Sequence, residues 1–222
     1  MKEYDNRFKD APWYEKAHKE NILFIGAGGI GSNALHCLTK TIPASYIVID
    51  MDSVEKYNIG TQFFQTDMIG MNKVDAVVRN SRTFGSNANI TPLNEPYNSN
   101  MYLPIMITGL DNMKTRKQCF DTWKEQEDRE LFIDGRLRAN LYEIYVVKPG
   151  NEAAYEATLF KDSEADDGPC TFKQTAYFAM LIGARITQVV VNHLTNKQLG
   201  EDICVVPFKI KEISEPFYFE KV

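Results

Sequence analysis

The sequence predicts an α/β fold built on a mostly parallel sheet, with an antiparallel C-terminal extension and a long buried C-terminal helix. Three observations support this prediction. A glycine-rich turn joins a short apolar run to a helical segment within residues 21–52. Apolar runs and polar, helix-like segments then alternate up to residue 150, as in chains that connect parallel strands through helices. Beyond residue 150 the alternation stops, and one long apolar segment dominates. This order is typical of a doubly wound, Rossmann-like sheet.

The segment from Asn21 to Asp52 carries the arrangement of a nucleotide-binding βαβ unit. Its expected elements are a strand at 22–25, a glycine run at 26–31, a helix at 32–40 and a strand at 46–49. Gly26 allows the tight turn, Gly28 lets the backbone approach a phosphate, and Gly31 lets the helix pack on the strand. Asp50 follows at about the 20-residue spacing of a ribose-binding carboxylate. A glycine-rich turn with a purely structural purpose remains the alternative.

The later elements follow from the same patterns. We expect helices at 71–81 and 113–127, and strands at 89–93, 104–108, 131–133 and 142–147, with a turn at Asp134–Arg136. We also expect an antiparallel strand at 153–160, a long helix at 171–194 and tail strands at 203–210 and 217–219. The long helix is apolar around nearly its whole circumference, which predicts burial in the core or in a subunit interface.

Length and composition narrow the classes of protein. The 222 residues are expected to form a single domain: an N-terminal arm at 1–20, a nucleotide-binding core at 21–150 and a C-terminal part at 151–222. The net charge of −5 argues against a general polyanion-binding surface. Four cysteines without a C-x-x-C pair argue against a zinc site or a disulfide framework. With no signal-peptide core and no run long enough to span a bilayer, we expect a cytoplasmic protein.

Polar side chains gather where the predicted strands end. Asp50 and Asp52 leave one strand, with Asn58 shortly after, and Asp111 leaves the strand at 104–108. Open α/β sheets bind their ligands at these carboxyl ends. Lys73 stands in the first turn of a predicted helix, where a lysine opposes the helix dipole. We therefore expect Lys73 to have a functional partner, with a solvated lysine as the alternative.

These residues resemble the ThiF/MoeB/HesA family, the adenylating domain shared with ubiquitin-activating enzymes. The similar segments are GAGGIGS, IDMDSVEKYNIGTQFF, Lys73, TGLDNMKTR and FIDGRLRANLYEIYVVKPG. The resemblance covers residues 21–150, and residues 170–195 more loosely. It implies Mg·ATP rather than NAD, and adenylation of a carboxylate with release of pyrophosphate. It further implies a homodimer and a partner that is a small ubiquitin-like (β-grasp) protein or a peptide with a C-terminal glycine. No nucleic acid partner is expected, although a tRNA substrate is left open.

The resemblance also implies a role for each candidate residue of the nucleotide site. Gly26, Gly28, Gly29 and Gly31 would bracket the phosphates, Asp50 would hold the ribose, Asp52 and Asn58 would line the pocket, Lys73 would neutralise phosphate charge, and Asp111 would bind Mg²⁺. Attack of a carboxylate on a phosphate brings negative charges together, so a site of this kind needs cations and oriented N–H donors.

One position departs from the family pattern, because Thr61 stands where the family has an arginine that stabilises the phosphates. Three explanations are open. Another cation substitutes (Arg7, Arg79 or Arg116), the acceptor is unusual, or the protein is an ATP-binding pseudoenzyme that serves as a scaffold. An NAD-dependent oxidoreductase is a weaker alternative, since it gives Lys73 and Asp111 no role. The absence of C-x-x-C motifs indicates a short, zinc-free branch of the family.

Cys170 is the cysteine with the best case for chemistry. It follows Pro169 at the start of the predicted long helix, where the helix dipole and free N–H groups would lower the pKa of a thiol. The acidic pair Asp166 and Asp167 lies just upstream and would oppose thiolate formation. Family members that pass the activated protein on as a thioester or acyl disulfide use a cysteine in this part of the fold, whereas others stop at the adenylate. For Cys170 both outcomes stay open.

Overall fold

The computed structural model describes residues 8–86, 88–138, 141–161 and 176–213. Its strands are β1 (Asn21–Ile25), β2 (Ser45–Ile49), β3 (Asn89–Leu93), β4 (Ile105–Thr108), β5 (Leu131–Arg138), β6 (Leu141–Val147) and β7 (Lys209–Ile213). Its helices are α1 (Tyr14–Ala17), α2 (Gly29–Thr41), α3 (Lys73–Thr83), α4 (Met113–Lys124), α5 (Glu152–Glu156) and α6 (Ala176–Leu199), with 3₁₀ turns η2 (Lys56–Asn58) and η3 (Thr66–Met68).

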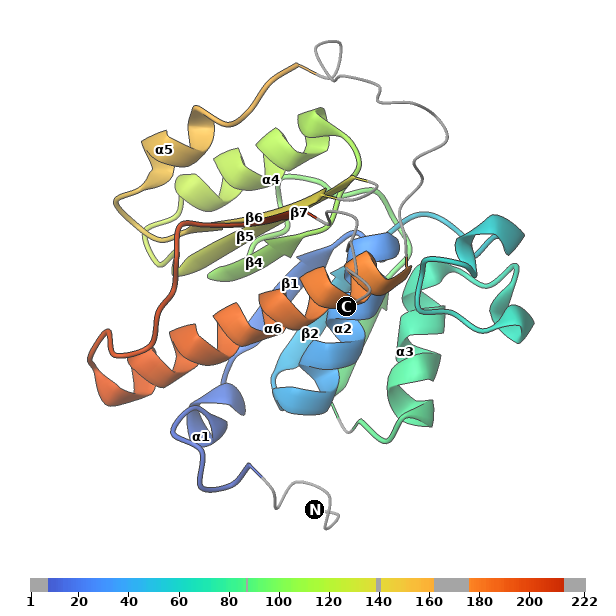
Figure 1. The fold of residues 1–222 in the computed structure, drawn as a ribbon, viewed down its shortest axis with the longest axis horizontal. Helices are drawn as coiled ribbons and strands as arrows, with labels where there is room; N and C mark the ends of the chain where they lie inside the picture. Colours follow the sequence, from blue (N-terminus) through green and yellow to red (C-terminus); the bar gives the residue numbers. More distant parts are fainter. Residues whose placement is uncertain (1–7, 87, 139–140, 162–175, 214–222) are drawn as a thin grey trace, which may run out of the picture.

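The strands of the described chain form a seven-stranded sheet with the order β3-β2-β1-β4-β5-β6-β7. The ladder from β3 to β5 is parallel, and β6 and β7 add to it antiparallel. The chain first moves outward from β1 to β3 and then returns to β4 and moves the other way. Right-handed crossovers therefore put α2 and α3 on one face and α4 on the other, as Figure 1 shows. The predicted fold class is confirmed.

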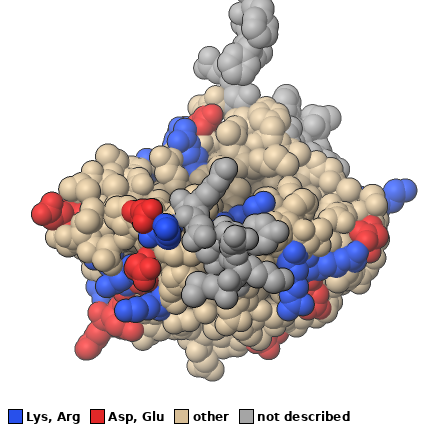
Figure 2. Space-filling view, turned by 90° about the horizontal axis from the view of Figure 1, so that it is seen from below, with Lys and Arg blue, Asp and Glu red and all other residues tan. Residues whose placement is uncertain are grey.

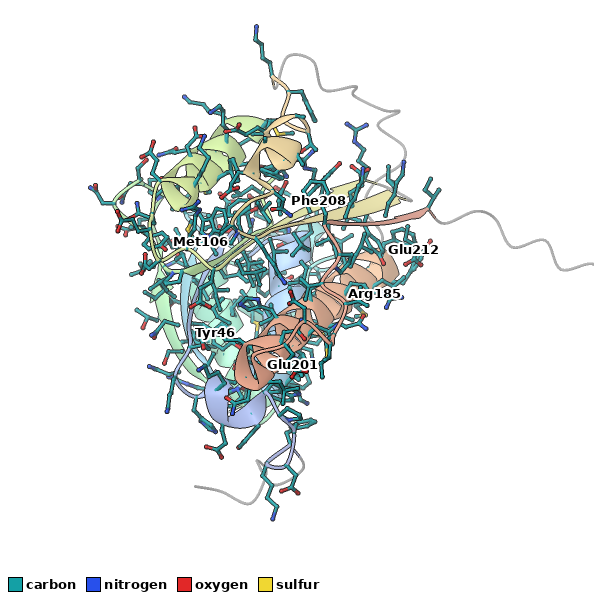
Figure 3. All side chains as sticks on the ribbon, turned by 90° about the vertical axis from the view of Figure 1, so that its left-hand side faces the viewer. Tyr46, Met106, Arg185, Glu201, Phe208 and Glu212 are labelled. Atoms are coloured by element: carbon teal, nitrogen blue, oxygen red, sulfur yellow. The ribbon has the colours of Figure 1, made fainter. Side chains whose placement is uncertain are left out.

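The central strand β1 is buried on both faces of the sheet. Ile22 and Phe24 belong to the apolar cluster under α2 and α6, whereas Leu23 and Ile25 belong to the cluster under α4. Figure 3 labels Tyr46 and Met106, one residue from each cluster, on opposite sides of the sheet. A parallel strand that is covered by helices on both sides needs a continuous apolar run, which is the pattern of β1.

Helix α6 lies along α2 on one face of the sheet (Figure 1). The helices approach closely at Gly183, where an added Cβ would lie 2.8 Å from the backbone nitrogen of Ala34. The opposite face of α6 exposes Tyr177, Met180 and Leu181 by 39–53%. Burial of this helix is thus confirmed for one face within the described chain.

One predicted turn is wrong. The expected turn at Asp134–Arg136 is the middle of β5, and Asp134 pairs with Tyr145 of β6. A fully buried aspartate can stand inside a strand here because its carboxylate is ion-paired with Arg116 and Arg136. The other helices and strands up to 147 lie within about three residues of the predicted bounds.

Two predicted C-terminal strands are also placed differently. Residues 153–160 hold the short helix α5 instead of a strand, because the outer edge of β6 is already paired with β7. The tail strand begins at Lys209 rather than at 203, since Cys204 is bound to α6 instead. Its backbone N–H and carbonyl make 2.8 Å hydrogen bonds with the side chain of Asn196. The predicted strand at 217–219 and the start of the long helix at 171–175 lie outside the described residues.

Charged side chains of both signs share the surface. On the face seen in Figure 2, acidic and basic side chains lie beside one another, so their fields partly cancel there. Across the described ranges, no helix has both the length and the apolar character needed to cross a membrane.

A cluster of charges ties α6 to the sheet. Lys197 Nζ lies 2.8 Å from Glu20 Oε1, just before β1, and 2.7 Å from Glu130 Oε2, just before β5. His193 and Lys197 together hold the pKa of the Glu130 carboxyl at about 2. We assign the larger part of this lowering of the pKa to Lys197, because His193 Nε2 lies 3.5 Å from the Glu130 carboxylate without the geometry of a hydrogen bond.

We expect Glu130→Gln to lower the free energy of unfolding by about 1 kcal/mol at pH 7, the upper range for partly exposed ion pairs. The pKa of Glu130 is about 2 in the folded protein and 4.5 ordinarily, so its contribution is complete above pH 4.5 and lost as the pH falls toward 2. Denaturant unfolding at pH 7 and pH 3 checks this, with the exposed Glu201→Gln as control. A deficit independent of pH would contradict the assignment.

Candidate functional site

The glycine turn after β1 is set by close packing. Gly26 has φ +92°, and an added Cβ there would lie 2.7 Å from the carbonyl oxygen of Gly109, which follows β4. A Cβ on Gly31 would lie 1.8 Å from the carbonyl oxygen of Gly26. No side chain fits at either position, so the loops after β1 and β4 meet at the point where the strand order reverses. Open α/β sheets have their binding crevice at this point.

Gly28 differs from these two glycines because the space beside it is open. The nearest atom to an added Cβ is Gln62 Nε2, at 3.9 Å. Gly28 is the N-cap of α2, and no described side chain caps the helix there. The first N–H groups of α2, beginning at Gly29, therefore keep the unpaired donors of a helix start and can receive an anion such as a phosphate.

Asp50, at the end of β2, closes the glycine turn. Its Oδ2 accepts a 2.6 Å hydrogen bond from the backbone N–H of Ala27, and its Oδ1 accepts a 2.8 Å hydrogen bond from the backbone N–H of Asp52. Burial raises the pKa of the Asp50 carboxyl, while these hydrogen bonds and the charge of Lys73 oppose the rise. Each carboxylate oxygen has a second lone pair, so Asp50 can still accept hydrogen bonds from ligand hydroxyls.

Lys73 forms an ion pair with Asp52, whereas its predicted functional role stays a prediction. Its Nζ lies 2.7 Å from Asp52 Oδ2, and its backbone N–H donates a 2.9 Å hydrogen bond to the Asp52 carbonyl. The Lys73 side chain is only 9% exposed, whereas that of Asp52 is 57% exposed, which excludes a solvated lysine. A continuous chain of contacts thus runs from Ala27 through Asp50 and Asp52 to Lys73.

Asn58, which is expected to line the pocket, holds the turn that precedes it together. It is buried in η2, where its Oδ1 accepts a 2.9 Å hydrogen bond from the N–H of Glu55. The following segment packs on the start of α2. Its Thr61 carbonyl accepts from Asn33 Nδ2 at 3.3 Å, and Phe63 N–H donates to Ser32 Oγ at 2.9 Å.

Gln62 also lies beside the glycine turn, although the sequence analysis does not single it out. Its amide lies beside the open space of Gly28, and its buried Oε1 has no hydrogen-bond partner within the described chain. The sequence offers one indication of this position, because Gln62 directly follows Thr61, the last residue of the segment that begins at Asn58.

Asp111 is exposed at the end of the loop after β4. That loop starts at Gly109, which packs against the glycine turn: a Cβ added to Gly109 would lie 3.3 Å from Gly31 N. Asp111 follows Gly109 by two residues along the chain. Asn112 caps α4 by accepting a 2.8 Å hydrogen bond from Thr115 N–H. Among the residues described, no group of three His, Cys, Asp or Glu side chains is placed to hold a metal ion. A lone exposed carboxylate fits Mg²⁺, which keeps several waters and binds through one or two carboxylates plus substrate phosphates.

Two of the three candidate substitute cations are already paired. Arg79 forms an ion pair with Asp67, nearly two helical turns beyond Lys73. Arg116 is buried and ion-paired with Asp134 at 2.6 Å. Arg116 is thus held within the protein framework, whereas Arg79 and Asp67 form a pair of two exposed side chains. Arg7 and Cys170 lie outside the described residues.

Comparison with known proteins decides the family. The model of the family described as "ThiF family" matches residues 4–214. The chain belongs to the ThiF family. The resemblance inferred from the glycine run and the downstream motifs is therefore confirmed.

Curated relatives of this ThiF-family chain carry the name "ubiquitin-like modifier-activating enzyme 5". The protein from Oryza sativa subsp. japonica is 38% identical over 66 residues, which cover 30% of this chain and 16% of the relative. The protein from Xenopus laevis is 23% identical over 216 residues, which cover 82% of this chain and 52% of the relative. The chain thus spans at most about half the length of these relatives.

Solved structures share the fold of this ThiF-family chain. PaaA matches with a TM-score of 0.71 at 18% identity, over 93% of this chain and 64% of PaaA. MccB from E. coli, solved with ATP, matches with a TM-score of 0.68 at 17% identity, over 91% of this chain and 63% of MccB. MccB has also been solved with MccA.

We expect the glycines of the turn to separate into two kinds when replaced by alanine. Gly31→Ala forces a Cβ into a backbone carbonyl and should destabilise the fold by about 3 kcal/mol or more. Gly28→Ala meets open space and should cost less than about 1 kcal/mol, the usual effect at an N-cap. Denaturant unfolding curves of both variants check this. Equal losses of stability would contradict the packing described for the turn.

Proposed function

We propose that the chain is an ATP-dependent adenylyltransferase that activates a C-terminal carboxylate. The carboxylate oxygen attacks the α-phosphorus of ATP, the bond from that phosphorus to the bridging oxygen breaks, and pyrophosphate leaves. The product is an acyl-adenylate. Membership of the ThiF family and the arrangement at the carboxyl ends of β1, β2 and β4 support this proposal.

Each group at this edge has a part in the proposed reaction. The Asp50 carboxylate accepts the ribose hydroxyls, and the open N–H groups beside Gly28 and Gly29 receive phosphate oxygens. Asp111 holds Mg²⁺, which neutralises phosphate charge when bound. Lys73 supplies the buried positive charge that the pyrophosphate needs as it leaves. Asp52 holds Lys73 until then, and its exposed position lets the lysine exchange one anionic partner for another.

The observation that carries the proposal is the chain of contacts from the glycine turn to Lys73. Asp50 binds the turn at 2.6 Å, and Asp52 binds the lysine at 2.7 Å. This chain of contacts supports the proposal because it fixes a carboxylate and a nearly buried lysine around a helix start that no described side chain caps. Such preorganised charge in a partly buried site lowers the barrier because it needs little rearrangement during the reaction.

The acceptor we propose is the C-terminal glycine of a small ubiquitin-like, β-grasp protein or of a peptide. The name of the curated relatives supports the first, and the MccB–MccA complex shows that a protein of this fold takes a partner. Arg7 is proposed to supply the cation missing at Thr61. Cys170 is proposed to receive the acyl group in a second step, in which the thiol loses its proton, its sulfur attacks the acyl carbon of the adenylate, and AMP leaves. We further propose a cytoplasmic homodimer that pairs through the exposed face of α6.

A second candidate function is an ATP-binding scaffold without adenylation. Thr61 favours it, as does the commitment of Arg79 and Arg116 to their own ion pairs. An NAD-dependent oxidoreductase uses the glycine turn and Asp50 but leaves the pairing of Lys73 with Asp52 without a purpose.

We expect Mg·ATP, but not NAD, to raise the melting temperature, since a ligand that binds only the folded state stabilises it by mass action. Calorimetry should give an affinity that falls about tenfold or more in Asp111→Asn, a variant at an exposed position that leaves the fold intact. Glu127→Gln, which removes the charge of an exposed carboxylate just after α4, is the control. Binding of NAD without ATP would refute the proposal.

We expect Arg7→Gln to lower ATP–pyrophosphate exchange about tenfold or more with a suitable acceptor and Thr61→Arg to restore exchange in that variant, because a charge-stabilising group contributes about 3 kcal/mol to such reactions. Thr61→Gln, similar in length but neutral, should have little effect. Exchange that is absent in both the native protein and Thr61→Arg, beside tight Mg·ATP binding, would favour the scaffold.

A further inference from the structure

A buried polar network lies behind the Asp111 loop. Asp134 of β5 pairs in parallel register with Thr108, the last residue of β4, and both are fully buried. On one side, Asp134 Oδ1 accepts hydrogen bonds from Arg116 Nε at 2.6 Å and Thr108 Oγ1 at 3.1 Å. On the other, Oδ2 accepts from Arg136 Nε at 2.7 Å and Tyr155 OH at 3.0 Å. The two oxygens of one carboxylate thus serve separate groups.

The Oδ1 side reaches the candidate site. Arg116 stands on α4 with 4% of its surface exposed, and its Nη2 donates a 2.6 Å hydrogen bond to the carbonyl of Leu110. Leu110 directly precedes Asp111, and Thr108 directly precedes Gly109. Asp134 Oδ1 therefore anchors both ends of the Gly109–Leu110 loop, through Thr108 on one end and through Arg116 on the other.

The Oδ2 side points away from that loop. The Arg136 guanidinium stacks 4.3 Å from the ring centre of Tyr145, and its other nitrogens donate to Thr158. Burial alone would lower the pKa of Arg136, but the neighbouring Asp134 carboxylate raises it overall. These contacts join β5 and β6 to the residues after α5 and make no contact with the loop after β4.

Stability alone is a weak reason for such a network. Removing charges from water costs several kcal/mol per ion, and well-packed apolar residues often replace a buried ion pair without loss. The better-supported use of buried ionic groups is to select one arrangement among several. Here the network would select one arrangement of the loop after β4, and this loop carries the exposed carboxylate of Asp111.

We propose that Asp134 is a positioning residue that acts through Arg116 to hold the Gly109–Asp111 loop, so that the Asp111 carboxylate is preorganised for the divalent cation of Mg·ATP. The inference rests on the proposed function, because it gives Asp111 its ligand. It assigns positioning to the Oδ1 side of the network and only stability to the Oδ2 side.

The test compares one variant from each side. Arg116→Lys keeps the charge but cannot reach both Asp134 and Leu110, whereas Tyr155→Phe removes a single hydroxyl from Oδ2. Thr108→Val, nearly isosteric, removes the other Oδ1 donor and serves if Arg116→Lys does not fold. Free energies of unfolding, amide hydrogen exchange of residues 109–112 without nucleotide, and calorimetric affinity for Mg·ATP and for ATP in EDTA are measured for each.

We expect the Oδ1 variants to speed hydrogen exchange at 109–112 about tenfold and to weaken Mg·ATP binding about tenfold. Binding of ATP in EDTA should change less than about twofold. Tyr155→Phe should lose stability while both other readouts stay within about twofold of the native protein. Equal effects of variants from the two sides would overturn the inference, as would unchanged exchange and affinity in Arg116→Lys and Thr108→Val.

The native protein and Asp111→Asn separate this failure from that of the proposed function. If the native protein binds Mg·ATP and Asp111→Asn weakens it, unaffected Oδ1 variants refute the positioning role alone. If the native protein does not bind Mg·ATP, the proposed function fails and the assignment of a cation to Asp111 fails with it.

Discussion

The structure depends on one close approach, between the loops that follow β1 and β4. Gly26 and Gly31 have no room for a side chain and Gly109 packs closely against Gly31, so α2 begins directly against the sheet. This contact places the uncapped start of α2, the end of β2 and the end of β4 at one edge. Asp50 and Asp111 follow two of these strand ends, and Lys73, the first residue of α3, reaches the same edge through its ion pair with Asp52.

The same edge shows how local positive charge is managed in a chain of net charge −5. Lys73 is almost buried and its charge is held by an exposed acid, an arrangement in which the acid gives way more easily than the lysine. The buried guanidinium of Arg116, in contrast, is bound on three sides by Asp134, Leu110 and Met113. One cation is thus paired with an exposed acid, and the other belongs to the framework.

Sequence patterns predicted the parts of this protein that depend on neighbours along the chain. The run in β1, the glycine turn and Asp50 follow local rules of spacing, and the structure places them as expected. The sequence predicts a turn at Asp134–Arg136 instead of a strand. The partners that stabilise Asp134 inside β5, Arg116 and Tyr155, lie 18 and 21 residues away, and no local rule reveals such pairing. The helix at α5 was missed for a similar reason, since β7 arrives from a distant segment to occupy the edge of β6. Asn58 follows the family motif, yet its contact with Glu55 within the turn emerges only in three dimensions.

The two edges of the described sheet bear on how a polypeptide partner can approach. The β3 edge carries Pro92, which has no N–H to donate, and the β7 edge exposes Lys209 and Lys211. Proline and lysine at sheet edges discourage pairing with a further strand and so protect against aggregation. Neither edge of the described sheet therefore favours extension of the sheet by another strand.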